Sequence, residues 1–451
     1  MNTAHAASNA GKPLPPGSLG LPWIGETLAF VQDSFAFFAE RRKKHGPVFK
    51  TRLLGEPVIC LTGPEAVSLF YDTRYFTRVD ASLPQLRELL HPEAIPFLDQ
   101  SHAHAVRRQL LLQAFTPEAL AGYVPLLERI TGRYLANWER TGSLLWVPEL
   151  RALCFDVANT LFAGASPDSS DPAAFAAFAR MNAGFLALPI KLPFTRYAGA
   201  LKGRDELRAY IHERISVTPE TAGAINVLGR LRAARTPAGE AMGSKELEIE
   251  TVHLFFGAFA VITGALVNVG IALAEHADVR ERVRSEVRAV TPSGPLDLEK
   301  LGKLSYLTQV SKEVRRYYKL VPTTFFARVK EDCELNGYRL PAGTKAIACL
   351  RETMHDPATF SAPDTFDPDR FSPERAEDKQ PNRFIPHGGG PWEGHRCAGE
   401  KLAELMIQVY ATLLLRDYTW ELPSADHALT SGELVPMPED GLPVRFAKHA
   451  G

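Results

Sequence analysis

The chain has 451 residues, of which 45% are hydrophobic and 23% are charged, and its formal net charge at pH 7 is −1. This composition is that of a globular protein and excludes general disorder. A nearly neutral chain has no global field that favours nucleic acid, so we expect no nucleic-acid partner. The length exceeds the roughly 250–300 residues that one hydrophobic core supports, which predicts two domains or one large layered domain.

The cysteines and the N-terminus indicate the compartment. The five cysteines are scattered, odd in number and without a C-x-x-C pair. This pattern argues against a disulfide framework or a zinc site and suits a reducing compartment. The first residues, MNTAHAASNAGKPLPPGS, lack the basic start and apolar run of a signal peptide. We therefore expect a cytoplasmic protein.

In chain order, the predicted elements begin with a disordered lead over residues 1–18. A helix follows over 34–46, with an apolar FAFF stripe and a glycine stop, and then a hairpin over about 47–62. From residue 64 to about 319 the periodicity is mostly helical. A strand-like pattern over 323–350, a Pro/Asp-rich loop over 356–391, a helix over 398–415 and short strands within 417–446 complete the chain. These patterns predict a mainly α fold with a small β region (α+β) drawn from both ends of the chain.

One mid-chain segment imitates a membrane span. Residues 252–274 contain no Asp, Glu, Lys or Arg, and a span needs about 20 apolar residues. However, His253, Thr263 and Asn268 interrupt the apolar run. Glu250 and Glu275 flank it without the Lys/Arg asymmetry of a membrane helix. We therefore predict a long helix through the core of a soluble domain, and no membrane span.

The segment FIPHGGGPWEGHRCAGEKLAEL carries most of the chemical information. Its three consecutive glycines predict a turn whose backbone passes close to something flat, and Gly399 lets the chain turn at once into a helix. Cys397 therefore precedes a helix N-terminus, where backbone N–H groups and the helix dipole stabilise a thiolate. Such a thiolate can ligate a haem iron. The alternative is a buried and inert cysteine beside a glycine-rich loop.

Further segments agree with a haem. Glu313 and Arg316 in SKEVRRYY lie one helical turn apart and can form a buried ion pair, which Arg370 of FDPDRF could complete. In SHAHAVRRQLLLQAF, His104 and Arg108 are also one turn apart. The remaining candidate cations are Arg328 in FFARVKED and His395. Cations that converge on one buried site suit the two propionates of a haem, whereas independent surface residues would have no such meaning.

With these motifs in this order, the chain resembles the cytochrome P450 family from LPPGSLGLPWIGETL to the terminal strands. The resemblance implies a single cytochrome P450 domain over 19–451, with the long central helix over the haem. It implies haem b as cofactor with Cys397 as the axial ligand of its iron, and a structural network of Glu313, Arg316 and Arg370. The residues that would hold the propionates are His104, Arg108, Arg328 and His395.

The cysteine loop departs from the family pattern. Six residues, PWEGHR, separate the glycines from Cys397, where about three are usual. This loop resembles that of the bacterial fatty-acid peroxygenases, which use hydrogen peroxide directly. Those enzymes anchor the substrate carboxylate with an arginine in the central helix, but no arginine lies between Glu250 and Glu275 here.

The central helix departs as well. The family reads A-G-x-D/E-T at this point, and the matching residues here are 257–261, so that Ala260 replaces the acid and Val261 the alcohol. Neither side chain can carry a proton. His253 lies on the same helical stripe as Ala260, either as a satisfied core histidine or as a pocket or proton-relay residue. The other members of this stripe are Gly257, Gly264, Asn268 and Ile271.

Three functions remain open. The first is a monooxygenase that hydroxylates or epoxidises a hydrophobic small molecule, acts as a monomer and receives electrons from a ferredoxin or flavodoxin. The second is a peroxide-dependent oxygenase, or an enzyme that rearranges a peroxide, acting on a fatty-acid-like substrate. The third is a non-catalytic haem protein. The resemblance implies a substrate pocket lined by Leu83, Leu86, Leu90, Phe256, Phe259, Val321 and Thr323.

Overall fold

The computed structural model describes residues 11–99, 101–220, 223–424 and 427–449. The chain divides into two compact units, and the single domain over 19–451 stays a prediction. Unit 1 comprises residues 1–105, 321–366 and 373–397, and unit 2 comprises residues 106–320, 367–372 and 398–451. This division agrees with a chain longer than one hydrophobic core supports.

Unit 1 combines the N-terminal elements with those that follow residue 321. Its helices are α2 (Thr27–Gln32), α3 (Ser34–His45), α4 (Pro64–Phe70), α5 (Pro84–Leu90), α16 (Leu350–Met354) and the 3-10 turn η1 (Ile95–Phe97). Its strands are β1 (Val48–Leu53), β2 (Glu56–Leu61), β3 (Phe76–Thr77), β5 (Ala327–Val329), β6 (Cys333–Leu335), β7 (Tyr338–Leu340) and β8 (Lys345–Ala348). Helix α6 (His102–Gln113) crosses the boundary between the units.

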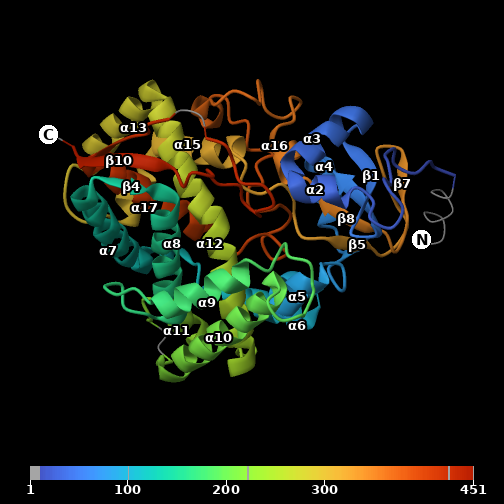
Figure 1. Ribbon diagram of the computed structural model, residues 1–451, viewed down its shortest axis with the longest axis horizontal. Coiled ribbons are helices and arrows are strands. Elements are labelled where there is room, and N and C mark those ends of the chain that lie inside the picture. The colour runs from blue at the N-terminus through green and yellow to red at the C-terminus, as the bar shows by residue number, and fades with distance from the viewer. Residues whose placement is uncertain (1–10, 100, 221–222, 425–426, 450–451) are drawn as a thin grey trace. The chain divides into compact units, whose positions relative to one another are not determined.

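The main sheet of unit 1 has the order β1-β2-β8-β5-β3. The predicted hairpin is present as β1 and β2, and β8 adds to β2 in parallel, with Val58 opposite Lys345. In Figure 1 the blue N-terminal strands therefore lie beside orange strands from late in the chain. Strand β3 was not predicted because two residues carry no periodicity.

Two features at the N-terminus differ from expectation. Residues 1–10 of the predicted disordered lead (1–18) lie outside the described residues, whereas residues 11–18 have a defined position. The amide of Lys50 donates to the carbonyl of Pro16 at 2.8 Å, and the amide of Arg339 donates to Pro13 at 2.9 Å. Helix α3 is present, but its cap is Asp33, whose carboxylate accepts from two backbone amides of the first turn.

Unit 2 is mainly helical. Its helices are α7 (Pro117–Thr141), α8 (Trp146–Ala163), α9 (Pro172–Asn182), α10 (Arg196–Val217), α11 (Val227–Ala233), α12 (Ser244–Glu275), α13 (Ala277–Val290), α14 (Leu298–Gly302), α15 (Ser305–Tyr317), α17 (Glu400–Asp417) and the 3-10 turn η2 (Pro368–Phe371). Its sheet, β4 (Ser143–Leu145), β10 (Pro443–Lys448) and β9 (Tyr418–Glu421), contains the predicted terminal strands. The fold is mainly α with a small β region, as the sequence predicts.

Helix α12 is the central helix of unit 2, drawn in yellow in Figure 1. Its 32 residues span about 48 Å at 1.5 Å per residue. In the described part of the chain it is the single helix long and apolar enough to cross a membrane, and the bent pair α6–α7 would pass that test only as one span. Most of its apolar window is buried, because apolar residues surround it on nearly all sides. A Cβ on Gly270 would lie 2.5 Å from the Trp146 ring, which explains a glycine there.

Candidate functional site

The loop that ends at Cys397 is held by its own backbone. The amide of Cys397 donates to the carbonyl of His387 at 3.4 Å, and the inserted residues form a turn in which Gly394 donates to Pro391 at 3.0 Å. The side chain of Asn382 accepts from the amide of Gly390 at 2.9 Å. All five cysteines lie in the described residues. Cys397 is exposed, whereas the other four are buried. Its thiol is therefore available to a ligand, three residues before α17 begins.

The glycines of this loop fit against an aromatic ring. Gly388 and Gly390 have φ angles of +85° and +80°, which L side chains rarely adopt. A Cβ on Gly390 would come within 2.6 Å of the Tyr71 ring, and one on Gly388 within 2.7 Å of the Tyr71 hydroxyl. The flat group that the glycines predict is thus, for these two residues, the side chain of Tyr71. Burial raises the pKa of the Tyr71 hydroxyl, and neighbouring Cys397 adds to this rise.

Two expected haem ligands lie together in unit 1. The rings of His104 and His395 have centroids 4.4 Å apart, and the Nε2 atoms of both are buried. His104 comes from α6, and His395 lies two residues before Cys397. The structure therefore brings two of the expected nitrogen donors together beside the cysteine loop.

Arg78 is a third nitrogen donor beside this loop, and sequence reasoning missed it. It lines a small pocket with His395, Tyr71, Phe70, Phe76, Thr73 and Asp99. Its guanidinium donates to the carbonyl of Phe70 at 3.1 Å and stacks 4.2 Å from the Phe70 ring centroid. Burial lowers the pKa of Arg78 to about 10. The carboxylate of Asp99 lines the same pocket and raises the pKa of Arg78, but it forms no ion pair with Arg78 within 4.0 Å in the described chain, so this buried cation suits an anionic ligand.

Arg328 has partners that differ from those expected. It stands on β5 between two buried residues, Ala327 and Val329, and therefore points to the opposite face of the strand. Its guanidinium donates to the carbonyl of Gly343 at 2.7 Å and forms an ion pair with Glu56 at 3.4 Å. The protein itself thus engages a cation that we expected to hold a propionate. Arg108 is buried in unit 2, next to Arg107 in the middle of α6.

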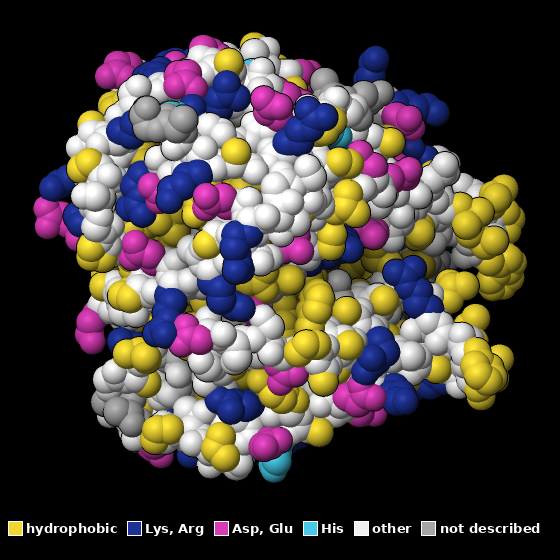
Figure 2. Space-filling view, turned by 60° about the vertical axis from the view of Figure 1, so that its left-hand side comes forward, with side chains coloured by type: hydrophobic (Ala, Val, Ile, Leu, Met, Phe, Trp, Pro, Cys, Tyr) yellow, Lys and Arg dark blue, Asp and Glu magenta, His cyan; other side chains and the backbone are white. Residues whose placement is uncertain are grey.

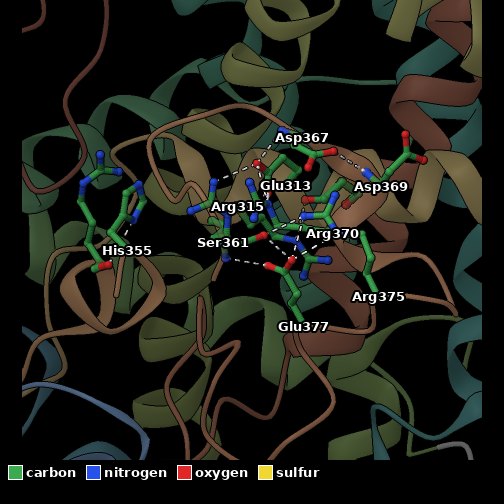
Figure 3. Close-up of polar contacts among 12 residues, drawn as sticks. Glu313, Arg315, His355, Ser361, Asp367, Asp369, Arg370, Arg375 and Glu377 are labelled. Atoms are coloured by element: carbon green, nitrogen blue, oxygen red, sulfur yellow. Dashed lines mark hydrogen bonds and ion pairs between the residues drawn. The ribbon is translucent and has the colours of Figure 1, made fainter. Parts of the chain in front are cut away.

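Glu313, Arg316 and Arg370 lie together in unit 2, and none of them has accessible surface. Figure 3 shows Glu313 between Arg370 and Asp367. Arg316 donates to both oxygens of Glu313, at 2.7 and 2.8 Å. Arg370 donates to the same carboxylate at 3.2 Å, and so does the backbone amide of Asp367, at 2.8 Å. Helix α15 and η2 are thereby joined through one carboxylate whose oxygens each accept at least one hydrogen bond.

One short stripe of α12 remains open although most of the helix is buried. Gly257 is exposed, and His253, Ala258, Ala260 and Val261 are half-buried. A Cβ on Gly257 would meet nothing within 4 Å. The stripe is shorter than the sequence predicts, because the space at Gly264 is filled by Val435, Leu320 and Met437, and Ile271 is buried. Small residues therefore border an open face around the positions of the missing acid and alcohol.

His253 is anchored at one end of this stripe. Its Nδ1 lies 3.1 Å from Oε2 of Glu250, which has no accessible surface. The other oxygen of Glu250 accepts from Arg107 at 3.1 Å, and Arg107 also pairs with Glu246 at 2.6 Å. A carboxylate held by arginine is an acceptor, so Nδ1 of His253 is the donor in this contact. The chain of contacts therefore fixes the imidazole orientation and leaves Nε2 for another group.

The expected substrate-pocket residues fall into separate clusters. Leu83 and Leu86 pack with the apolar core of unit 1, and Leu90 is buried. Phe256 packs against Phe185 with ring centroids 4.2 Å apart, and Phe259 packs against Phe178 at 4.8 Å. The remaining two, Val321 and Thr323, are half-buried.

Comparison with known proteins identifies the family. The Cytochrome P450 family model matches residues 15–444. Cytochrome P450 120 of Synechocystis sp. is 35% identical over 439 residues, which cover 96% of this chain and 97% of that protein. The chain belongs to the cytochrome P450 family. It is therefore an oxidoreductase, and the cofactor of its family is haem b, iron protoporphyrin IX.

Two solved P450 structures are similar along nearly the whole chain. Retinoic acid bound cyanobacterial CYP120A1 has a TM-score of 0.89 and 33% identity over 97% of this chain and 100% of that chain. CYP152N1 with myristic acid has a TM-score of 0.78 and 26% identity, again over 97% of this chain and 100% of that chain. The residues of this P450 fit a haem, because an accessible thiol, two histidines and a buried arginine without a carboxylate supply a ligand for iron and donors for propionates.

Proposed function

We propose that this P450 inserts oxygen into an apolar small molecule that carries a carboxylic acid group, with Cys397 as the thiolate ligand of the haem iron. The observation that carries the proposal is the open stripe of α12, where small apolar residues follow a single titratable side chain, His253. When bound, the haem supplies the oxygen-transfer chemistry, and the thiolate favours O–O cleavage. Retinoic acid and myristic acid, named with two similar structures, are both apolar carboxylic acids.

For the haem we propose His104, Arg108 and His395 as propionate donors, together with Arg78. Arg328 is left out of this set because Glu56 and the carbonyl of Gly343 already engage its guanidinium. Arg78 supports the set best, because a buried cation without a carboxylate partner is costly until an anion binds beside it.

His253 has the role of an anchor in this proposal. Glu250 accepts from Nδ1 and keeps the imidazole in one orientation, while Arg107 forms an ion pair with Glu250. Nε2 of the imidazole then remains for a hydrogen bond with the carboxylic acid group of a substrate or with an ordered water. Glu250 and Arg107 are positioning residues, since they act through His253.

The test compares acids with their methyl esters. Binding to the haem protein is followed by the spectral shift that accompanies displacement of water from the iron. For His253→Gln we expect acids to bind about tenfold more weakly while esters are unaffected, because a charge-assisted hydrogen bond contributes about 1.5–3 kcal/mol. His212→Gln on α10 is the matched control, since His212 likewise pairs with a glutamate of α12, Glu248, but is exposed. Equal losses for acids and esters would contradict the anchor.

A second function is favoured by Ala260 and Val261, which can neither donate nor accept a proton. Under this alternative the enzyme uses peroxide and needs no redox partner, in keeping with the likeness of its cysteine loop to that of the peroxygenases. Under the first scheme a ferredoxin or flavodoxin supplies electrons in the cytoplasm. Turnover with reductase and dioxygen, compared with turnover with peroxide alone, separates the two. Val261→Thr should improve coupling to reductase only under the first scheme, because it restores an alcohol.

A further inference from the structure

The open stripe of α12 has a defined length. His253, Gly257, Ala260 and Val261 lie on one helical face, because they recur at i, i+4, i+7 and i+8. Val261 comes eight residues after His253, which is about 12 Å along the helix. His253 is the single titratable side chain of the stripe. The stripe is therefore an apolar surface of fixed length with one polar group at its N-terminal end.

The polar end of the stripe is fixed by its contacts. Side chains of a helix lean toward its N-terminus, and Glu250, which accepts from Nδ1 of His253 at 3.1 Å, lies one turn earlier on that side. The imidazole is thereby prevented from swinging along the stripe toward Val261. A carboxylic acid group held at Nε2 of His253 therefore lies about 12 Å from the level of Val261.

The other end of the stripe is closed by three side chains of unit 2. A Cβ on Gly264 would lie 2.6 Å from Cγ1 of Val435, 3.0 Å from Cδ2 of Leu320 and 3.4 Å from Cε of Met437. We call Leu320, Val435 and Met437 the end wall, and all three are buried. Gly264 comes eleven residues after His253. The end wall therefore lies about 16 Å along α12 from the polar end.

Hydrogen bonds within its own segment hold the end wall in place. The amide of Thr430 donates to the carbonyl of Met437 at 2.8 Å, and the amide of Met437 donates to the hydroxyl of Thr430 at 3.1 Å. Glu433 of the same segment forms an ion pair with Arg151 of α8 at 3.2 Å. These contacts give Val435 and Met437 a fixed position relative to α12.

The stripe also differs from the outer surface in its lack of charge. On the face of the molecule in Figure 2, charged side chains of both signs are scattered among apolar ones. Residues 254–264 of α12 carry no charged side chain. Beside the stripe, Phe256 and Phe259 are held by packing against other aromatic rings. A ligand that lies along the stripe is therefore expected to be apolar over this length.

We propose that the open stripe selects acids by their length, an inference that rests on the proposed function. A bond of about 1.5 Å near the tetrahedral angle advances an extended carbon chain by about 1.25 Å. A chain held at His253 therefore reaches the level of Val261 at about its tenth or eleventh carbon and meets the end wall at about its fourteenth. The acids that fit best have about 12–14 carbons in the chain, or an apolar body of equal length.

The same distances set the position of oxidation. The carbons level with Ala260 and Val261, which replace the acid and alcohol of the family, are about the ninth to eleventh. With dioxygen, one oxygen atom enters a C–H bond there and the other leaves as water, with two electrons from the redox partner and two protons from solvent. With peroxide, one oxygen atom enters the C–H bond and the other leaves as water. In both schemes the new hydroxyl group lies far from the carboxylic acid group.

The test measures the binding of straight-chain acids of six to eighteen carbons, and of their methyl esters, to the haem-loaded protein. Calorimetry gives the dissociation constants without turnover. We expect acids of about 12–14 carbons to bind most tightly, and acids of about eight or eighteen carbons to bind at least about tenfold more weakly. Shorter chains leave apolar surface of the stripe uncovered, and longer chains must bend at the end wall.

Two variants should move this optimum in opposite directions. Val435→Ala shortens a side chain of the end wall, so we expect the optimum to become about one or two carbons longer. Gly257→Leu fills the middle of the stripe, where a Cβ meets nothing within 4 Å. It should weaken binding of the twelve-carbon acid at least about tenfold relative to the six-carbon acid.

Matched controls exist for both variants. Val444→Ala on β10 is the control for Val435→Ala, since both valines are 2% exposed. Gly132→Leu on α7 is the control for Gly257→Leu, because a Cβ on Gly132 also meets nothing within 4 Å. Neither control should move the optimum. Haem content shows whether each variant is folded, and Met437→Ala replaces Val435→Ala if that variant loses haem.

The outcomes separate the selection by length from the anchor at His253. Equal binding of acids and esters would contradict the proposed function and, with it, the selection by length. Acids that bind more tightly than esters, but with no optimum or with the same optimum in Val435→Ala, would overturn the selection by length alone. A product that carries its new hydroxyl group beside the carboxylic acid group would overturn it as well, because that group would then lie at the far end of the stripe.

Discussion

Buried arginines occur in both units of this P450, and they differ in whether a carboxylate forms an ion pair with them. In unit 2, Arg316 and Arg370 surround the carboxylate of Glu313, and all three side chains have no accessible surface. In unit 1, Arg78 is almost as buried, yet no carboxylate of the described chain pairs with it. The first group is complete within the protein. Asp99 lines the pocket of Arg78 but forms no ion pair with it, and we therefore propose that a haem propionate is the partner of this arginine.

The difference shows how a structural arginine can be distinguished from a ligand-binding one. A buried arginine with its acid contributes to the fold and reports little about ligands, because the pair satisfies itself. A buried arginine without an acid costs stability in the empty protein, and binding of an anion recovers that cost. Burial alone therefore does not distinguish structural from ligand-binding cations, whereas the presence of a carboxylate partner does.

The largest expected effect concerns Cys397, the proposed thiolate ligand of the haem iron. Cys397→Ala should abolish turnover and remove the long-wavelength absorption of the reduced carbon monoxide complex, because the thiolate that shapes this band is lost. Cys349→Ala, which removes a buried thiol of unit 1, should retain the band. A thiolate-type spectrum in Cys397→Ala would show that another residue binds the iron.

Removal of the acid from the complete group should destabilise the protein. Glu313→Ala leaves Arg316 and Arg370 buried without that carboxylate, and we expect a loss of about 3–5 kcal/mol in the free energy of unfolding, with low soluble yield. Denaturant unfolding measures the loss. Glu299→Ala is the control, because its ion pair with Lys303 is exposed and should contribute almost nothing. Loss of turnover with unchanged stability would contradict a structural role.

Removal of the Arg78 cation should instead stabilise the haem-free protein against unfolding. Because burial lowers the pKa of Arg78 to about 10, its charged form is disfavoured in the folded state. Arg78→Met should therefore raise the free energy of unfolding of the haem-free protein by about 1–3 kcal/mol. The gain should shrink as the pH rises above about 10, since the folded protein then releases this proton before the unfolded chain does.

The same variant should lose haem about tenfold faster, because one charge-assisted hydrogen bond to a propionate is missing. Arg74→Met is the matched control, as Arg74 is exposed and paired with Asp72. Arg74→Met should change neither the free energy of unfolding of the haem-free protein nor the rate of haem loss. A haem-free Arg78→Met protein that is less stable than the wild type would place Arg78 with the structural arginines.

The smallest effect concerns another buried arginine, Arg315 of α15, which lies 3.7 Å from Glu404 of α17. Burial alone would raise the pKa of the Glu404 carboxyl, but Arg315 and Lys401 hold it below its ordinary value of 4.5. The stabilisation is therefore complete above pH 4.5 and is lost as the pH falls through the lower pKa of the folded state. Glu404→Gln should be less stable than the wild type near pH 7 by about 1 kcal/mol, and the difference should vanish in acid. A difference that grows in acid would contradict the pairing.

Motifs with fixed spacing made much of the site predictable. One helical turn separates Glu313 from Arg316, so covalent geometry alone places them side by side. Cys397 was identifiable because its glycines and the helix after it are local features of the chain. The long helix α12 and the terminal strands were likewise evident from the apolar pattern.

Tertiary context decided what the sequence left open. Arg78 has no motif, and its burial results from side chains such as Phe70 that only the fold brings around it. The partners of Arg328 could not be predicted either, because Glu56 and Gly343 lie in other segments that only the fold brings to its strand. The sequence predicts Gly264 as part of an open stripe, but the side chain of Val435, which lies far along the chain, occupies the space beside it.

The parallel pairing of β2 with β8 has a consequence for biosynthesis. The ribosome completes β2 early, but the strand that covers its edge is made only after most of the chain, on the order of half a minute later at ~5–20 residues per second. During that interval a buried, apolar strand, with Val58, Ile59 and Cys60 at its centre, exposes unpaired amides and carbonyls. Nascent chains of this P450 are therefore candidates for chaperone binding. Slower translation between the hairpin and β8 should lower the soluble yield without any change in the mature enzyme.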